Sequence, residues 1–149
     1  MTNTFIPQTR ALVKIDNASN VLTDISSVVS TIAVNVSRNN AGFKTFGLPG
    51  EQRVAGKPSY NGTLGIRPTI EAGEGFDLLT AFFMTEEPDA RTIEAYWPDD
   101  SAGSYILTGE VLPGNAPIVN QNAEGDGTPV NHDFAIDFDG SPSLDFVGA

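Results

Sequence analysis

The side chains of this chain that could do chemistry are one histidine and nineteen carboxylates, with no cysteine. Without cysteine there are no disulfides, no thiolate metal sites and no thiol nucleophile, which suits a reducing cytoplasm. His132 has no serine partner motif, and the nucleophile elbow, phosphate loop and zinc-protease signatures are all missing. A lone histidine beside a strand is more often a packing residue, so the sequence favours no catalytic site and no cofactor.

The acids are the remaining candidates for a site. Glu86–Glu87, Asp99–Asp100 and the run Asp137–Gly140 place carboxylates close together. The last begins like a calcium loop but lacks the later oxygen ligands and the closing glutamate. A glycosidase-like carboxylate pair stays open, because nothing in the sequence selects one pair. The segment GEGF (Gly73–Phe76) could present free amides to an anion, but Glu74 would repel it. Solvated surface acids are the favoured interpretation.

Charge is divided along the chain. Residues 1–67 hold seven of the eight Lys and Arg and carry a net charge of +4, whereas residues 68–149 carry −15, for a total of −11. The bases are scattered, so they do not predict the basic groove that nucleic-acid binding needs. Two interpretations stay open: a solubilising acidic surface, or basic and acidic surfaces that meet between copies of the chain.

The elements that must position these residues are mostly strands. Apolar and polar residues alternate in six segments, which predicts half-buried strands over residues 11–18, 28–37, 59–67, 91–97, 104–112 and 131–139. One segment has helical spacing, with Phe76, Leu79 and Phe83 in register, and predicts a helix over 76–86. Residues 1–10 are expected to be an N-terminal arm. The fold class is therefore mainly β: an antiparallel β-sandwich or barrel-like domain over residues 1–149, with one flanking α-helix.

A long connection, residues 38–58, separates two of these strands. Neighbouring strands need only two to five linking residues, yet this segment holds glycines, charges and the apolar side chains of Phe43, Phe46 and Leu48. Residues 114–130 form a second long connection. Long loops in compact domains are often functional. The aromatic loop either packs on a neighbouring molecule or folds back on its own sheet.

Five segments in order resemble the major tail tube proteins of long-tailed, siphovirus-like bacteriophages. They are VLTDISSVVSTIAVNVS (Val21–Ser37), FKTFGLPGEQRVAGKPSYNGTLGI (Phe43–Ile66), FDLLTAFFM (Phe76–Met84), SYILTGEVL (Ser104–Leu112) and DFAIDFDGSPSL (Asp133–Leu144). The resemblance runs from Asn17 to Leu144 and lies in the order and spacing of these segments rather than in a catalytic signature. The chain has little beyond its last strand, so no extra C-terminal domain is expected.

The resemblance implies a structural virion protein, not an enzyme, that forms stacked hexameric rings around a channel for DNA delivery. Its partners would be other copies of itself and tail proteins such as the tape measure and the terminator, in a virion tail assembled in the host bacterial cytoplasm. The N-terminal arm and the long loop would reach neighbouring subunits. The expected inter-subunit contacts are Phe43, Lys44, Thr45, Phe46, Gly47, Leu48 and Arg53.

A channel through which DNA slides should lack basic clusters. The strand faces opposite the predicted core offer candidates that meet this demand, and none of these candidates is basic. The candidates for lining the lumen are Thr31, Asn35, Asn61, Thr63, Thr108, Glu110, Asp133 and Asp137. DNA would pass without specific binding. No apolar run reaches the roughly 20 residues that cross a bilayer, so no membrane insertion is expected.

Two other classes remain as alternatives. One is a secreted or cell-surface β-sandwich that binds a ligand, for which the neighbouring aromatics Tyr96 and Trp97 are the only hint. The start of the chain, MTNTFIPQTR, does not resemble a secretory signal, which weighs against it. The other is a small hydrolase, which would depend on one or two of the carboxylates.

Overall fold

The computed structural model describes residues 11–70, 75–98, 103–121, 123–128 and 130–148. Ten strands and one helix lie in these ranges. In chain order they are β1 (Leu12–Asp16), β2 (Leu22–Asp24), β3 (Val29–Arg38), β4 (Ala41–Phe43), β5 (Gln52–Val54), β6 (Pro58–Ile66), α1 (Gly75–Met84), β7 (Arg91–Trp97), β8 (Tyr105–Pro113), β9 (His132–Phe138) and β10 (Ser143–Phe146). The predicted N-terminal arm, the pair Asp99–Asp100 and the first two residues of GEGF lie outside the described residues.

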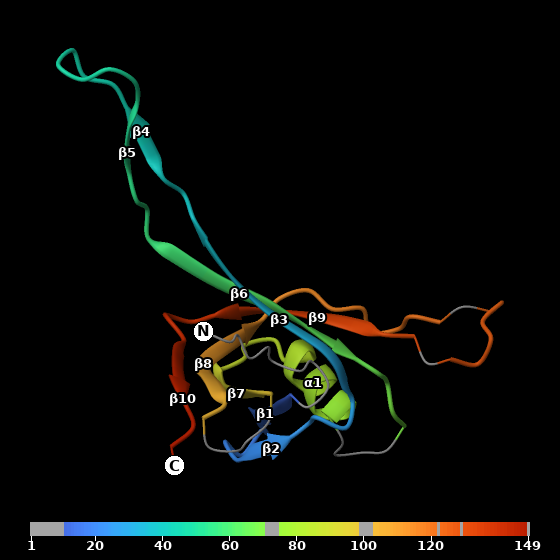
Figure 1. The fold of residues 1–149 in the computed structure, drawn as a ribbon. Coiled ribbons are helices and arrows are strands. Elements are labelled where there is room, and N and C mark those ends of the chain that lie inside the picture. Colours follow the sequence, from blue (N-terminus) through green and yellow to red (C-terminus); the bar gives the residue numbers. More distant parts are fainter. Residues whose placement is uncertain (1–10, 71–74, 99–102, 122, 129, 149) are drawn as a thin grey trace, which may run out of the picture.

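Eight strands form one antiparallel sheet in the order β2-β1-β7-β8-β9-β6-β3, with β10 paired to β8 beside β9. The sheet curls around the helix, so that β3, β6 and β9 lie on one side of α1 and β1, β2 and β7 on the other (Figure 1). Strands β2 and β3 are not joined to each other within the described chain, so the curl is not a closed barrel. The predicted mainly-β class with one helix is confirmed.

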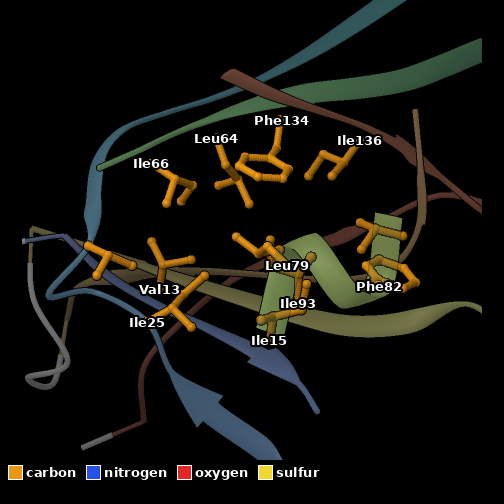
Figure 2. Packing of buried hydrophobic residues seen from close by; sticks show 12 residues of the cluster. Val13, Ile15, Ile25, Leu64, Ile66, Leu79, Phe82, Ile93, Phe134 and Ile136 are labelled. Carbon is orange, nitrogen blue, oxygen red and sulfur yellow. The ribbon is translucent and has the colours of Figure 1, made fainter. Parts of the chain in front are cut away.

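The core lies inside this curl, because alternate residues of each strand turn inward. Val13 and Ile15 of β1 face the helix from one layer, and Leu64 of β6 and Phe134 of β9 face it from the other (Figure 2). All of these side chains are almost fully buried. The alternation that predicted the strands is therefore also what assembles the core.

Helix α1 supplies the middle of the core. Leu79 and Phe82 are buried between the two layers, so the helix lies inside the curl rather than over one end of the sheet. It begins at Gly75, where a Cβ atom would lie 2.5 Å from Cγ2 of Val28. It ends at Met84, two residues before the predicted end, and Thr85 donates its hydroxyl to the carbonyl of Ala81 over 2.8 Å. That bond closes the last turn.

Candidate functional site

A hairpin projects from the body where a long loop was expected. Strands β3 and β6 pair from Val29 to Arg38, beyond the core, and the pairing resumes in β4 and β5 after a short break. We call residues 38–58 the projecting hairpin; it points away from the rest of the chain (Figure 1). At its base Arg38 donates to the carbonyl of Gly56 over 2.9 Å, and Gly56 donates its N–H to Asn40 over 3.1 Å. The hairpin is thus a continuation of the sheet.

The seven predicted contact residues all lie on the outer part of this hairpin. Phe43 ends β4, Arg53 is in β5, and the other five form the turn region between them. Large apolar side chains here are exposed: Phe46 fully, and Phe43, Leu48 and Val54 by about half. The loop does not fold back on its own sheet, so one of the two interpretations left open by the sequence is removed. Exposed apolar side chains that gather in this way are typical of a surface that contacts another molecule.

We call β4, β5 and the turn between them, residues 41–54, the outer hairpin. Its two faces differ in chemistry. Directly paired residues of antiparallel strands share a face. Phe43 pairs with Gln52 and Ala41 with Val54, which makes one face largely apolar. Arg53 pairs with Gly42 on the other face, where its guanidinium lies 3.4 Å from the carboxylate of Glu51. Both side chains of this ion pair are well exposed, so it contributes little stability.

Six of the eight predicted lumen residues come together on the outer face of β3, β6 and β9. The register aligns them in three rows across the strands, all on the side opposite the core. The rows are Thr31–Gly65–Asp133, Ala33–Thr63–Ala135 and Asn35–Asn61–Asp137. Every side chain is small, polar or acidic, and none in these rows is basic. The surface is therefore polar and carries net negative charge.

The other two predicted lumen residues are placed differently. Thr108 and Glu110 lie on β8, which joins the two layers of the curled sheet. Glu110 accepts a hydrogen bond from the hydroxyl of Thr92 over 2.6 Å, and Thr92 belongs to β7 in the opposite layer. Both residues face outward, but they are not part of the three rows. Alternation predicted the correct face of their strand but could not predict which strands lie beside it.

An aromatic stack on β7, β8 and β10 was missed by sequence reasoning. The ring centroids of Trp97 and Tyr105 lie 5.3 Å apart, and those of Tyr105 and Phe146 lie 4.7 Å apart. The strand register sets Tyr105 opposite both partners. Tyr96, by contrast, points to the other face and donates its hydroxyl to Glu94 over 2.8 Å. Tyr96 and Trp97 therefore do not form the shared ligand site that the sequence hinted at.

The residues considered for chemistry form no reaction centre in the part of the chain that the structure describes. His132 is buried, with its Nδ1–H directed to the carbonyl of Pro117 at 3.0 Å and the ring of Phe76 packed edge-on. Across the described ranges, no three acidic or histidine side chains gather to hold a metal ion. Two surface pockets, of about 180 and 290 Å³, are small for ligand sites, which typically span about 300–1,000 Å³.

The larger pocket contains a half-buried cation. Arg91 lies among Asn17, Thr23 and Leu78, with its guanidinium 4.3 Å from the centre of the Phe82 ring. Burial lowers the pKa of Arg91, and the nearby carboxylate of Asp16 partly offsets this. The guanidinium also donates to the carbonyl of Asp16 over 3.4 Å. This arrangement ties β7 to β1 and the helix, which is a packing role.

No protein-family model and no curated protein matches the sequence. Solved structures do match the fold. One match is a chain from the sheath/tube terminator of an extracellular contractile injection system, PVC, in its extended state. It superposes with a TM-score of 0.73 and is 13% identical in sequence, and the match covers 97% of this chain and 99% of that chain. A chain of the extended PVC sheath-tube complex gives 0.70, at 14% identity over 95% and 92%. The protein has a tail-tube-like fold.

The tail-tube-like fold extends beyond injection systems. A chain from the tail of an empty gene transfer agent particle, refined with C6 symmetry, gives a TM-score of 0.58 at 15% identity over 90% of this chain and 94% of that one. These matches come from phage-like tails of several kinds, so the fold is not specific to long-tailed phages. They are structural parts of particles rather than enzymes. Within the described residues, no helix is long and apolar enough to cross a membrane.

Proposed function

We propose that the protein is the subunit of a tail tube and polymerises as stacked rings. The observation that carries this proposal is the projecting hairpin, whose large apolar side chains stand in water on a chain with a tail-tube-like fold. An interface between two different surfaces of identical subunits repeats in rings or along an axis, and so builds a closed ring or a filament. The predicted contacts Phe43–Leu48 and Arg53 would then be buried between subunits.

The outer face of β3, β6 and β9 would line the channel. Its three rows offer no positive charge, so phosphates find no cation to which they could bind by releasing counterions. Asp133 and Asp137 would repel DNA and keep it sliding. Thr108 and Glu110 on β8 would sit at the edge of this surface rather than at its centre.

The proposed ring has six subunits. The baseplate of the anti-feeding prophage, which also contains a chain with this fold, is six-fold symmetrised, and the gene transfer agent tail has C6 symmetry. We extend that symmetry to this chain. The tube would deliver DNA from a phage-like virion, such as that of a long-tailed bacteriophage, and would be assembled in the bacterial cytoplasm. Tape-measure and terminator proteins would be its other partners.

Electron microscopy of the purified protein tests the proposal. At concentrations above the assembly threshold, negative-stain images should show tubes or stacked rings with a central channel. Class averages viewed down the axis should show six-fold symmetry. A protein that remains a monodisperse monomer at high concentration, in both low and high salt, would instead favour the ligand-binding module. Rings with another symmetry would support the tube and contradict only the proposed number of six subunits.

A further inference from the structure

A second exposed apolar surface lies on β7, β8 and β10, on strands far from the projecting hairpin in sequence. We call Trp97, Tyr105, Leu144 and Phe146 the aromatic patch. Leu144 and Phe146 of β10 are each 58% exposed, although they are large apolar residues. Trp97 and Tyr105 are half-buried on the neighbouring strands β7 and β8 and stack in series with Phe146.

The register explains why this patch is apolar. Leu144 pairs with Leu107, which pairs with Ala95, and Phe146 pairs with Tyr105, which pairs with Trp97. These residues share the sheet face of Ile93, a core residue. None of the four belongs to the buried core around α1. The core-lining face therefore continues past the helix, and no described residue of the chain covers its end.

The patch also lies on a free edge. Strand β10 pairs with β8 alone, so its other edge has no strand beside it in the described chain. Exposed edges with apolar side chains invite another strand or hairpin. The projecting hairpin has the matching features: two edges that no described strand covers, and an apolar face formed by Phe43 and Val54 with Phe46 at its tip.

Charge makes a second copy of the chain the best occupant. The hairpin, residues 38–58, carries Arg38, Lys44, Arg53 and Lys57 against the single acid Glu51, a net charge of +3. Residues 138–149, which contain β10, carry two aspartates and no Lys or Arg, a net charge of −2. Both are exposed: Asp139 lies between β9 and β10, and Asp145 lies on β10 between Leu144 and Phe146, with its side chain on the opposite face of the strand. Opposite potentials favour this pairing over hairpin with hairpin.

We propose that the projecting hairpin of one subunit docks on the aromatic patch of a neighbouring subunit, with Phe46 against Leu144 and Phe146. This inference rests on the proposed polymerisation and names the surface that receives the hairpin. It gives the divided charge of the chain a role, because the basic segment and the acidic segment meet at every contact. It also explains why aromatic side chains stay exposed at two distant places in one small domain.

Cysteine cross-linking between two variants tests the contact, since the native chain has no cysteine. Phe46→Cys and Leu144→Cys are made as separate proteins, mixed at a concentration above the raised assembly threshold expected on loss of the Phe46 ring, assembled and treated with a short bismaleimide. The expected result is a main band at about twice the 15.8 kDa monomer mass that contains both variants. Each variant assembled alone should give far less. If Leu144→Cys does not fold, Phe146→Cys replaces it.

A matched control uses Ala33→Cys, an exposed position on the outer face of β3. Mixed with Phe46→Cys, it should not cross-link above background. If tubes form but the Phe46→Cys variant links to the Ala33→Cys variant, or to neither partner, the docking proposal is overturned. The proposal that the protein forms a tube would still stand. Strong linkage of Leu144→Cys to Phe5→Cys within one chain would show that residues 1–10 cover the patch, which also overturns it. Failure of the unmodified protein to polymerise would overturn both proposals.

Discussion

Asn61 of β6 lies directly opposite Asp137 of β9, on the face of the sheet turned away from the core. Asn35 of β3 completes this row on the other side of Asn61. A row of two amides and one carboxylate across three strands has no role in the packing of the core. Its chemistry suits a surface that contacts water and must not hold an anion, which is what a channel for DNA requires.

We predict that the double variant Asp133→Lys, Asp137→Lys makes this surface bind DNA. Both side chains are exposed, so tubes should still form. Two new positive charges per subunit would neutralise phosphates. The logarithm of the DNA affinity should then fall linearly with the logarithm of the salt concentration, with a slope of roughly −0.9 for each phosphate neutralised. The measurement is retention of short duplex DNA by assembled tubes from about 50 to 200 mM salt, with slower genome delivery in a particle.

The control for this prediction carries the same charge change elsewhere. Glu86 and Glu87 are exposed beyond the end of α1, away from the three rows. Their double lysine variant should leave DNA retention at the unmodified level. Equal retention by both variants would mean that net charge rather than position matters, and the lumen assignment of β3, β6 and β9 would then fail.

We predict opposite outcomes for two phenylalanines. Phe46 is fully exposed, so Phe46→Ala should change the free energy of unfolding by less than about 0.5 kcal/mol. A phenylalanine at a well-packed interface contributes on the order of 2 kcal/mol, so the assembly threshold should rise roughly 30-fold. Phe82 is buried in the core, and Phe82→Ala should cost about 3–5 kcal/mol of folding free energy. Urea unfolding and sedimentation measure the two quantities. A Phe46→Ala protein that assembles normally but melts early would place Phe46 in the monomer core.

The sequence predicted the long strands well because their alternation is strong. The segment 91–97 matches β7, and the predictions for β3, β6 and β8 differ from the structure by one residue at each end. Leu64 and Phe134 are examples of the reason. A strand that is buried on one face only has apolar residues at every second position, and few other structures produce this two-residue period in the sequence. The helix was found for the same reason, since Leu79 and Phe82 repeat with its own period.

The sequence did not predict what depends on contacts between distant segments. Strands β4 and β5 hold three residues each, with Gly42 in one and Arg53 in the other, so no alternation marks them. The aromatic patch depends on β8 pairing with both β7 and β10, which periodicity cannot reveal. Thr108 and Glu110 were assigned to the correct face of their strand, but they lie outside the three rows because β8 pairs with β9 only from Val111 to Pro113.

We predict that Asp126 titrates below the ordinary range of an aspartate. The backbone N–H of Thr128 donates to its carboxylate over 3.0 Å, and this bond, with a further contribution from the Thr128 side chain, lowers the pKa of Asp126. A lowered folded-state pKa contributes stability above the unfolded-state value, and that contribution is lost as pH falls through the folded-state value. NMR titration of the carboxyl carbon measures this. Thr128→Ala should remove part of the shift, whereas Thr128→Ser keeps both donors and should retain it. An unshifted Asp126 would mean that the turn is not populated in solution.

We predict that the outer hairpin exchanges its amide protons quickly in the monomer and slowly in the tube. Three residue pairs join β4 to β5, and a two-stranded hairpin without a core is marginally stable in water. Fixing each backbone residue costs roughly 1–2 kcal/mol, which a neighbouring subunit must offset. At low concentration the protein should be mainly monomeric, with fast exchange over 41–54 and slow exchange in β6 around Leu64. Assembly should protect 41–54 and leave Leu64 unchanged. If the outer hairpin is already strongly protected in the monomer, and assembly adds nothing, then its order comes from the chain itself and the hairpin is not the element that joins subunits.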